Sequence, residues 1–379
     1  MTRMASLTCA VFGGMALLPS FAQAERGRGS EERFIATVRL PGVEVVRELH
    51  HFDPSTGEVV VLDRSGSREF PDVRFMDQQG RHLALRRREA EMPLAGRIEL
   101  DGQRPGPHRV FAEPEVDRME PAALSPDGKS IVFFHAPKNL LVIGDDKEIH
   151  RVATDWALAR PFSWSPDSSQ VAFYYAPSSW EDDFNIQQHG VAVLSLNGKL
   201  RELVKPSEAT ATPTNSCAKD VPPGWGRTGE YLYYTGGLKR DDPAWQYDCP
   251  TYCHSPTATW RVNIKTGQVE RIGMGTFACV SPDEEYVLIY PSPKPAADGK
   301  WVIGTTMVRL ATRELTYLSD EIVFPRISPS GKLVACFSPE QEIRLFTTSD
   351  WRQHGKAIPL PEGVPLESWT TSFRWVVME

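Results

Sequence analysis

The sequence predicts an all-β fold, a β-propeller, and two observations lead to it. A Ser-Pro-Asp-Gly turn recurs with a short apolar run behind it, and the copies are spaced by about the length of one propeller blade. Each residue of Ser125–Gly128 suits a tight reversal of the chain, and the following Ile131–Phe134 is β-branched and aromatic, as strands often are. Further copies begin at Ser165, Ser281 and Ser328, with a degenerate copy at Trp225.

The spacing of these turns predicts the number of blades. Successive turns lie 40 to about 60 residues apart, and the four short strands of a blade need roughly 40 to 45 residues. Weaker strand patterns lie at 34–40, 43–49 and 73–112, and residues 369–377 are typical of a final strand pair. A C-terminal strand that pairs with the N-terminal strands would close the ring and remove exposed sheet edges. The prediction is one propeller domain, 33–379, of seven blades, or of six if the first strands lie outside the ring.

The N-terminus is typical of an export signal. Arg3 precedes an apolar stretch at 7–18, and Ala22–Ala24 has the small-residue pattern of a cleavage site. The apolar stretch is shorter than the roughly 20 residues that cross a bilayer. The sequence therefore predicts a signal peptide at 1–24, a mobile leader at 25–32 and no transmembrane anchor. The expected location is the periplasm of a Gram-negative bacterium, or otherwise outside the cell.

Three insertions point to a binding surface. Strand direction alternates within a blade, so the connections from second to third strands all emerge on one face of a propeller. The segments 176–190, 236–257 and 291–300 are long connections of this kind, and long loops on a rigid scaffold often bind partners. The alternative is that these loops fold on themselves, with the rings packed down and the acids solvated. The candidate partner-binding residues are Trp180, Glu181, Asp182, Asp183, Asp241, Asp242, Trp245 and Tyr247.

The cysteines predict a disulfide that restrains the second insertion. Cys217 lies before this insertion, while Cys249 and Cys253 lie within it, and an oxidising compartment permits a disulfide from Cys217 to either of them. A zinc site of Cys249, Cys253 and His254 is a competing interpretation that lacks an evident fourth ligand. Two further cysteines, Cys279 and Cys336, fall in predicted strands and are expected to be buried free thiols. The alternative for Cys279 is a disulfide with whichever of Cys249 and Cys253 is not bonded to Cys217.

The repeated Ser-Pro-Asp-Gly turn, with the strand behind it, resembles the WD-like repeats of the TolB-type propeller family. The resemblance is best between residues 120 and 360. It implies the fold and little chemistry, because such blades occur in periplasmic partner-binding proteins, in peptidases and in sugar-acting enzymes. A separate N-terminal domain like that of TolB is not evident, because strand patterns begin close to the predicted cleavage site.

The function predicted from the sequence is that of an exported, non-enzymatic binding module for a protein or glycan of the cell envelope. The sequence has no Gly-x-Ser-x-Gly elbow and no His-Glu-x-x-His motif, so no catalytic or cofactor-binding residue is assigned. The net charge of −7 argues against a nucleic-acid partner, and a monomer is expected. The alternative is a propeller enzyme, a lactonase or a glycan-acting hydrolase or lyase, with a metal or carboxylates at the channel mouth. In this alternative, the carboxylates of Asp182, Asp183, Asp241 and Asp248 could coordinate calcium.

Overall fold

The structure is a computed structural model, and all of its described regular elements are strands. This confirms the all-β prediction. The first strand begins at Glu31, so residues 31 and 32 of the predicted leader belong to a sheet, while the predicted signal peptide lies outside the described residues. The structure describes residues 31–40, 46–52, 54, 59–65, 72–76, 82–88, 92–101, 104–112, 119–127, 130–135, 139–143, 149–153, 157–176, 188–208, 212–213, 221–238, 242, 257–295, 301–338, 340–360 and 374–378.

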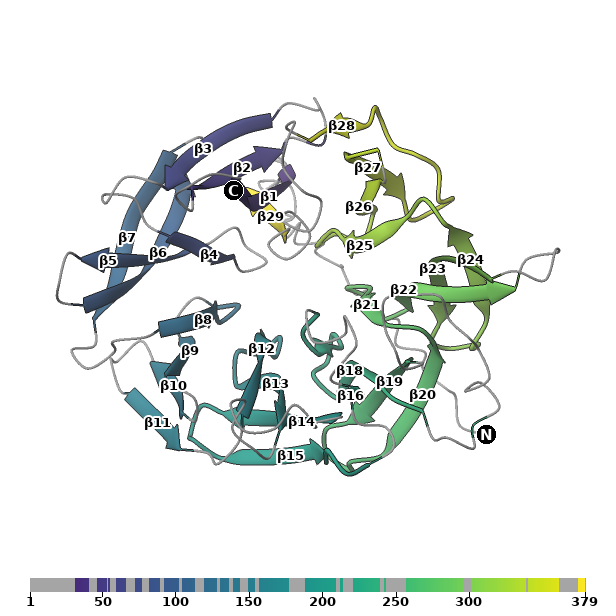
Figure 1. Ribbon diagram of the computed structural model, residues 1–379, viewed down its shortest axis with the longest axis horizontal. Helices are drawn as coiled ribbons and strands as arrows, with labels where there is room; N and C mark the ends of the chain where they lie inside the picture. The colour runs from purple at the N-terminus through teal and green to yellow at the C-terminus, as the bar shows by residue number, and fades with distance from the viewer. Residues whose placement is uncertain are drawn as a thin grey trace, which may run out of the picture.

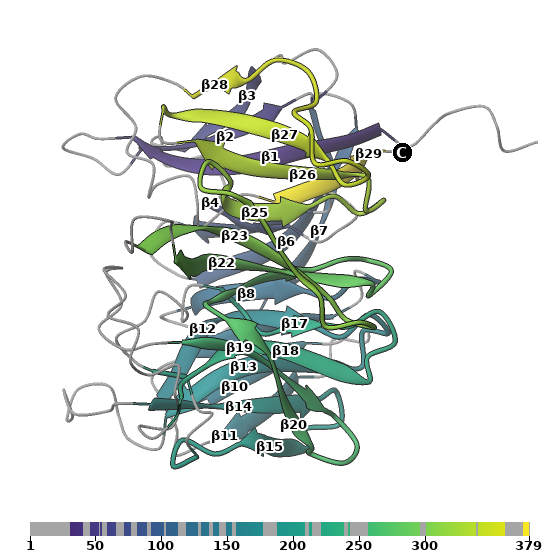
Figure 2. The same cartoon turned by 90° about the vertical axis from the view of Figure 1, so that its right-hand side faces the viewer.

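The described strands form seven antiparallel sheets that stand side by side in a ring (Figure 1). In the side view, the strands run across the thickness of this ring from one face to the other (Figure 2). We number these sheets blades 1 to 7 in chain order. Blade 1 combines both chain ends in the order β29 (Arg374–Met378), β1 (Glu31–Leu40), β2 (Val46–Phe52) and β3 (Val59–Ser65).

The other six blades use strands in simple chain order. Blade 2 contains β4 (Asp72–Met76), β5 (His82–Arg88), β6 (Met92–Asp101) and β7 (Arg104–Ala112), and blade 3 contains β8 (Met119–Leu124), β9 (Ile131–His135), β10 (Asn139–Ile143) and β11 (Ile149–Ala153). Blade 4 contains β12 (Ala157–Trp164), β13 (Gln170–Ala176), β14 (Gln188–Ser195) and β15 (Leu200–Val204), with the short β16 (Thr212–Pro213) beside β14. Blade 5 contains β17 (Gly224–Trp225), β18 (Tyr231–Gly236), β19 (Ala258–Asn263) and β20 (Val269–Met274). Blade 6 contains β21 (Phe277–Val280), β22 (Tyr286–Pro295), β23 (Trp301–Arg309) and β24 (Leu315–Ser319), and blade 7 contains β25 (Val323–Ile327), β26 (Leu333–Ser338), β27 (Glu342–Thr347) and β28 (Ile358–Pro359).

The recurring turns connect the first and second strands of blades 3 to 7, as the sequence predicts. In each of the four serine copies the serine is almost fully buried, and its Oγ accepts a hydrogen bond from the amide five residues later, at 2.9 to 3.2 Å. The serine amide donates to the carbonyl of the same later residue at 2.8 to 2.9 Å. One buried side chain therefore satisfies backbone groups that the reversal of the chain would leave without a partner.

Neighbouring turns also contact one another. Ser168, the fourth residue of the blade 4 turn, accepts a hydrogen bond on its Oγ from the Asp127 amide of the blade 3 turn at 3.0 Å. A Cβ added at Gly331 in blade 7 would lie 3.5 Å from Pro282 Cδ of blade 6. Gly331 has a φ of 75°, a backbone conformation that glycine adopts without strain. The turns therefore link adjacent blades on the face opposite the predicted insertions.

The hydrophobic core lies between the blades. Tyr174 of blade 4 packs with Leu232 of blade 5, and Phe52 of blade 1 packs with Phe337 of blade 7. All four side chains have no exposed surface. Burial of one such side chain contributes about 1.5 to 3 kcal/mol, so each blade depends on its two neighbours for stability.

The two chain ends meet in blade 1. β29 pairs antiparallel with β1, and Trp375 of β29 lies opposite Phe34. The Trp375 indole Nε1 also donates to the carbonyl of Arg326 in blade 7, at 2.8 Å. Trp225 of blade 5 makes the equivalent bond to Ser163 of blade 4, at 2.9 Å. The C-terminal strand is therefore paired within blade 1 and bonded to the neighbouring blade 7.

Replacement of the buried turn serine of blade 6, Ser281→Ala, is expected to lower the free energy of unfolding by about 1 to 2 kcal/mol. The serine Oγ accepts hydrogen bonds from the amides of Glu285 and Tyr286, both at 3.0 Å, and the serine is 1% exposed. Urea unfolding measures the change. The control is Ser319→Ala, because Ser319 Oγ accepts one exposed amide bond at 3.0 Å; its effect should stay within about 0.5 kcal/mol. Equal effects of the two substitutions would contradict this role of the serine.

Candidate functional site

The three insertions begin and end on one face of the ring, which we call the insertion face. They join β13 to β14, β18 to β19 and β22 to β23, the second and third strands of blades 4, 5 and 6. The described strands continue into the predicted loops, since Gln188–Gly190 belongs to β14. Most predicted contact residues lie outside the described residues: Trp180, Glu181, Asp182, Asp183, Asp241, Trp245 and Tyr247, together with Cys217, Cys249 and Cys253.

Asp242 is the one predicted contact residue within the described part of the chain. Its Oδ2 accepts a hydrogen bond from Arg271 Nη1 of β20 at 2.7 Å. The aspartate side chain is 20% exposed and the arginine is 43% exposed, so solvent weakens this ion pair. The pair connects the beginning of the second insertion to the outer strand of its own blade.

The third insertion differs from the predicted loop at 291–300. Pro291–Pro295 continue β22, and Ser292–Pro295 pair with Trp301–Gly304 of β23, so the described part of this insertion is an extended hairpin. The sequence did not indicate this because three prolines fall within the ten residues, and proline is unusual in a paired strand. The base of the hairpin is bonded to the link before β21, because Thr276 donates to the Pro291 carbonyl at 3.3 Å and accepts from the Tyr290 amide at 2.9 Å.

Two aromatic rings meet between blades 6 and 7, at the base of this hairpin. The ring centroids of Tyr290 and Phe324 are 5.1 Å apart with an interplanar angle of 64°, an edge-to-face contact. Both side chains are half-buried. Phe324 has a φ of 49°, which is a strained conformation for a bulky residue, and strained residues of this kind recur at binding and active sites.

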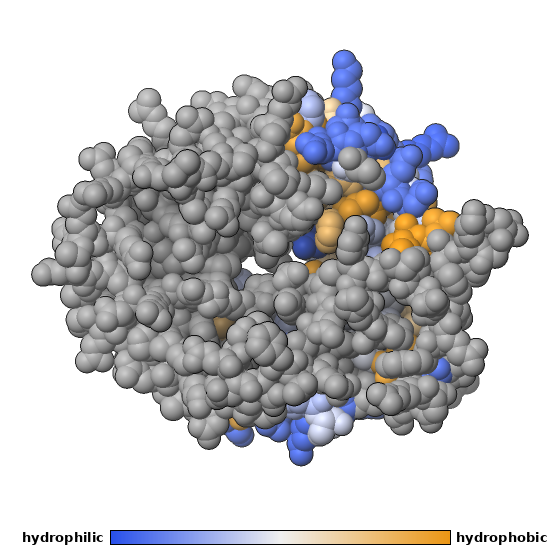
Figure 3. Space-filling model, in the orientation of Figure 1, coloured by the Kyte–Doolittle hydropathy of each residue, from blue (hydrophilic) through white to orange (hydrophobic). Residues whose placement is uncertain are grey.

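Arg326 lies two residues further along β25, the innermost strand of blade 7. The space-filling view shows an opening at the centre of the ring, which the innermost strands surround (Figure 3). Arg326 Nη1 donates to the carbonyl of Pro325 at 3.0 Å, and the Cys279 Sγ of blade 6 donates to the same oxygen at 3.5 Å. Among the described residues, no carboxylate forms an ion pair with Arg326.

Burial determines the ionisation of these two side chains. It lowers the pKa of the Arg326 guanidinium, and the nearby Cys279 opposes the shift; arginine still remains charged at neutral pH. Burial raises the pKa of the Cys279 thiol to about 11, although the Arg326 charge opposes this change. At neutral pH the pair is therefore a cation beside a neutral thiol.

The position of Arg326 in the repeat distinguishes blade 7 from blades 3 to 6. In blades 4 to 7, the residue two before the turn is half-buried and the residue three before the turn is buried. In blade 5 Gly226 takes the place of the turn serine, because its amide donates to the carbonyl five residues later. The residue two before this position is small in blades 3 to 6, namely Ala123, Ser163, Gly224 and Cys279, and it is the large, charged Arg326 in blade 7. Counting back from the turns identifies Arg326 in the sequence as the one charged residue at this position of the five repeats.

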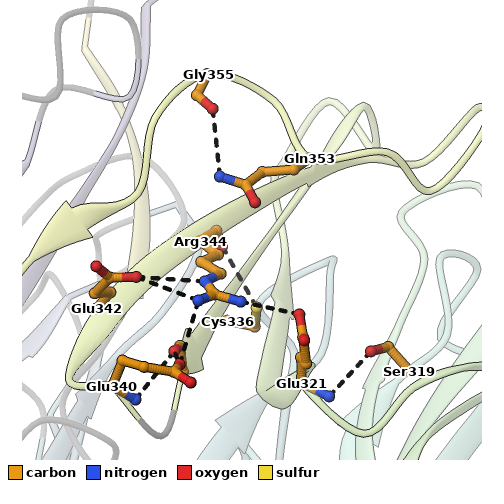
Figure 4. Close-up of polar contacts among 9 residues, drawn as sticks. Ser319, Glu321, Cys336, Glu340, Glu342, Arg344, Gln353 and Gly355 are labelled. Atoms are coloured by element: carbon orange, nitrogen blue, oxygen red, sulfur yellow. Dashed lines mark hydrogen bonds and ion pairs between the residues drawn. The ribbon is translucent and has the colours of Figure 1, made fainter.

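A second arginine of blade 7 has the partners that Arg326 lacks. Arg344 of β27 contacts Glu321 at 2.9 Å, Glu340 at 3.2 Å and Glu342 at 3.4 Å (Figure 4). The arginine is 18% exposed, while the two nearer glutamates are more than 60% exposed. These bonds tie two connections of the insertion face to β27 and use all three nitrogens of the guanidinium.

The described residues contain no group of three or more histidine, cysteine or acidic side chains that could hold a metal ion. Within the same part of the chain, no helix has the length and apolar character needed to cross a bilayer. Cys279 and Cys336 carry free thiols in strands β21 and β26; Cys336 is fully buried and Cys279 is half-buried.

Comparisons with known proteins identify the fold of this chain. The sequence matches no protein-family model and no curated protein. The structure is similar to the tricorn protease, with a TM-score of 0.57 and 13% identity over 87% of this chain and 36% of the protease chain. A functionally unknown protein from Desulfotomaculum acetoxidans gives a TM-score of 0.51 and 10% identity over 91% of this chain and 98% of that chain. TolB from Acinetobacter baumannii, at a TM-score of 0.42 and 11% identity over 84% and 78% of the two chains, is also among the similar structures.

The chain is therefore a β-propeller. The TolB-type resemblance of the repeated turn agrees with these structural likenesses. At identities of 13% and 10%, the likenesses to the tricorn protease and to the Desulfotomaculum acetoxidans protein establish the fold and leave the function to be argued from the site.

The two described thiols should react slowly in the native protein. Iodoacetamide attacks the thiolate, and the pKa values of about 11 for Cys279 and about 12 for Cys336 leave little thiolate at pH 8. The labelled fraction of Cys279, measured by peptide mass mapping, should rise about tenfold per pH unit between pH 8 and 10. The control is the protein unfolded in urea, where both thiols return to a pKa of about 8.5. Equal labelling rates in the native and unfolded protein at pH 8 would contradict the assignment.

Proposed function

We propose that this protein is an exported, non-enzymatic binding module for a protein or glycan of the cell envelope. The observation that carries the proposal is that three consecutive blades place their second-to-third connections on one face. A propeller holds such connections on a rigid ring, so that adjacent segments present one continuous surface to a partner. The proposed contact surface comprises 176–190, 236–257 and 291–300, with the predicted aromatic and acidic residues on it.

The composition of this surface supports a protein or a glycan as the partner. Tryptophan and tyrosine beside carboxylates serve as anchors in protein interfaces, and aromatic rings also stack on sugars. The net charge of −7 disfavours a polyanion such as nucleic acid. Asp242 illustrates how such an insertion is held, because its ion pair with Arg271 connects the start of the segment to the blade.

Crosslinking in the cell tests this proposal. A photoactivated amino acid is placed at position 180 or 245 of the full-length protein, and crosslinked species are identified by mass spectrometry. We expect both positions to capture the same envelope component. The double change Trp180→Ala and Trp245→Ala should reduce capture from a third insertion-face position, 242, at least tenfold, because interface tryptophans typically contribute 2 kcal/mol or more.

The matched control is the same photoactivated residue at Thr266, which is exposed in the turn between the third and fourth strands of blade 5, on the opposite face. Capture of one component from 180, 245 and 266 alike would indicate non-specific contact. Capture of nothing from 180 and 245 would refute the proposed surface.

A further inference from the structure

Arg326 is a charged side chain in a place where charge is costly. It lies on an innermost strand, its surface is half-buried, and its Nη1 is bonded only to the neutral carbonyl of Pro325 among the described residues. Removing a cation from water without a counter-charge is unfavourable. The structure therefore maintains a destabilising charge on the innermost strand of blade 7.

The repeat shows that the fold itself does not need this charge. The equivalent positions of four other blades carry Ala123, Ser163, Gly224 and Cys279. Arg344 in the same blade shows how this chain holds a guanidinium for structural purposes, with three glutamates within 3.4 Å. A large side chain that replaces a small one, and that lacks such partners, is typical of a binding residue.

We propose that Arg326 binds a carboxylate group of a ligand that enters the central opening from the insertion face. The inference rests on the proposed function, since it names the chemical group that the partner presents there. The guanidinium has a planar fork of N–H donors that matches a carboxylate with two parallel hydrogen bonds. Cys279, a neutral thiol on the innermost strand of blade 6, donates its S–H to the Pro325 carbonyl and brings no competing charge.

The surroundings favour a carboxylate with an apolar neighbour over a multiply charged anion. One guanidinium balances one carboxylate, and a protein with a net charge of −7 repels a dianion such as phosphate. Tyr290 and Phe324 form their edge-to-face pair between the insertion face and Arg326, because β25 runs from that face toward the turn at Ser328. An apolar group attached to the carboxylate therefore has aromatic rings to contact.

Binding of defined carboxylates to the purified protein tests the inference. N-acetylphenylalanine represents a peptide carboxylate and glucuronate a sugar carboxylate; their amides are the neutral controls, and inorganic phosphate is the dianion. Isothermal titration at pH 7 and low salt should show at least tenfold tighter binding of one carboxylate than of its amide. The carboxylate that binds more tightly identifies the peptide or the sugar as the source. Equal binding of acid and amide, or tighter binding of phosphate, would overturn the inference.

Three variants show whether Arg326 is the binding residue. Arg326→Gln should weaken binding of the preferred carboxylate at least tenfold, and Arg326→Lys should retain part of the affinity because it keeps the charge and loses the fork. The matched control, Arg344→Gln, changes the paired arginine of the same blade and should leave binding unchanged. Wild-type affinity in Arg326→Gln would refute the assignment.

Thermal unfolding separates a binding role from a structural one. Arg326→Met removes the unpaired charge and should raise Tm by about 1 to 3 °C, whereas Arg344→Gln leaves glutamates unpaired and should lower it. A fall in Tm for Arg326→Met would show that the arginine is structural and would overturn the inference. If crosslinking finds an insertion-face partner while all carboxylates fail to bind, only this inference fails and the proposed function stands.

Discussion

The structure depends on apolar packing between neighbouring blades, which the described side chains show from blade 3 to blade 7 and between blades 7 and 1. Tyr174 and Leu232 between blades 4 and 5, and Phe52 and Phe337 between blades 7 and 1, have no exposed surface because the sheets follow one another around a ring. A ring leaves no terminal sheet with an uncovered face. The same arrangement brings the innermost strands of the blades together around one opening, and so determines where a site can form.

The turn motif made the fold predictable from the sequence. A buried serine hydroxyl that accepts the amide five residues later is a local solution to chain reversal, so the same residues recur wherever a first strand meets a second. Its spacing reports the length of a blade. The hairpin extension at Pro291–Pro295 was not predictable in this way, because its pairing with Trp301–Gly304 is set by the neighbouring strand and overrides the low strand preference of proline.

The candidate site shows the same difference between local and distant determinants. The insertions are visible as excess length between turns, whereas the environment of Arg326 is formed by Cys279, Phe324 and Trp375, which lie in three different strands. Sequence alone does not reveal that a guanidinium lacks a counter-charge, since this depends on which side chains the ring brings together. The contrast with Arg344, whose glutamates are two to four residues away or at the preceding link, separates a structural arginine from one available to a ligand.

Amide hydrogen exchange of the native protein tests the closed ring most directly. If β29 completes blade 1 and is bonded to blade 7 through Trp375, the amides of Arg374–Met378 that pair with β1 should exchange only through global unfolding, at the same free energy as those of β26. Exchange of β29 at the rate of an unprotected C-terminal tail, with β26 still protected, would contradict the closed ring and with it the central opening on which the site depends.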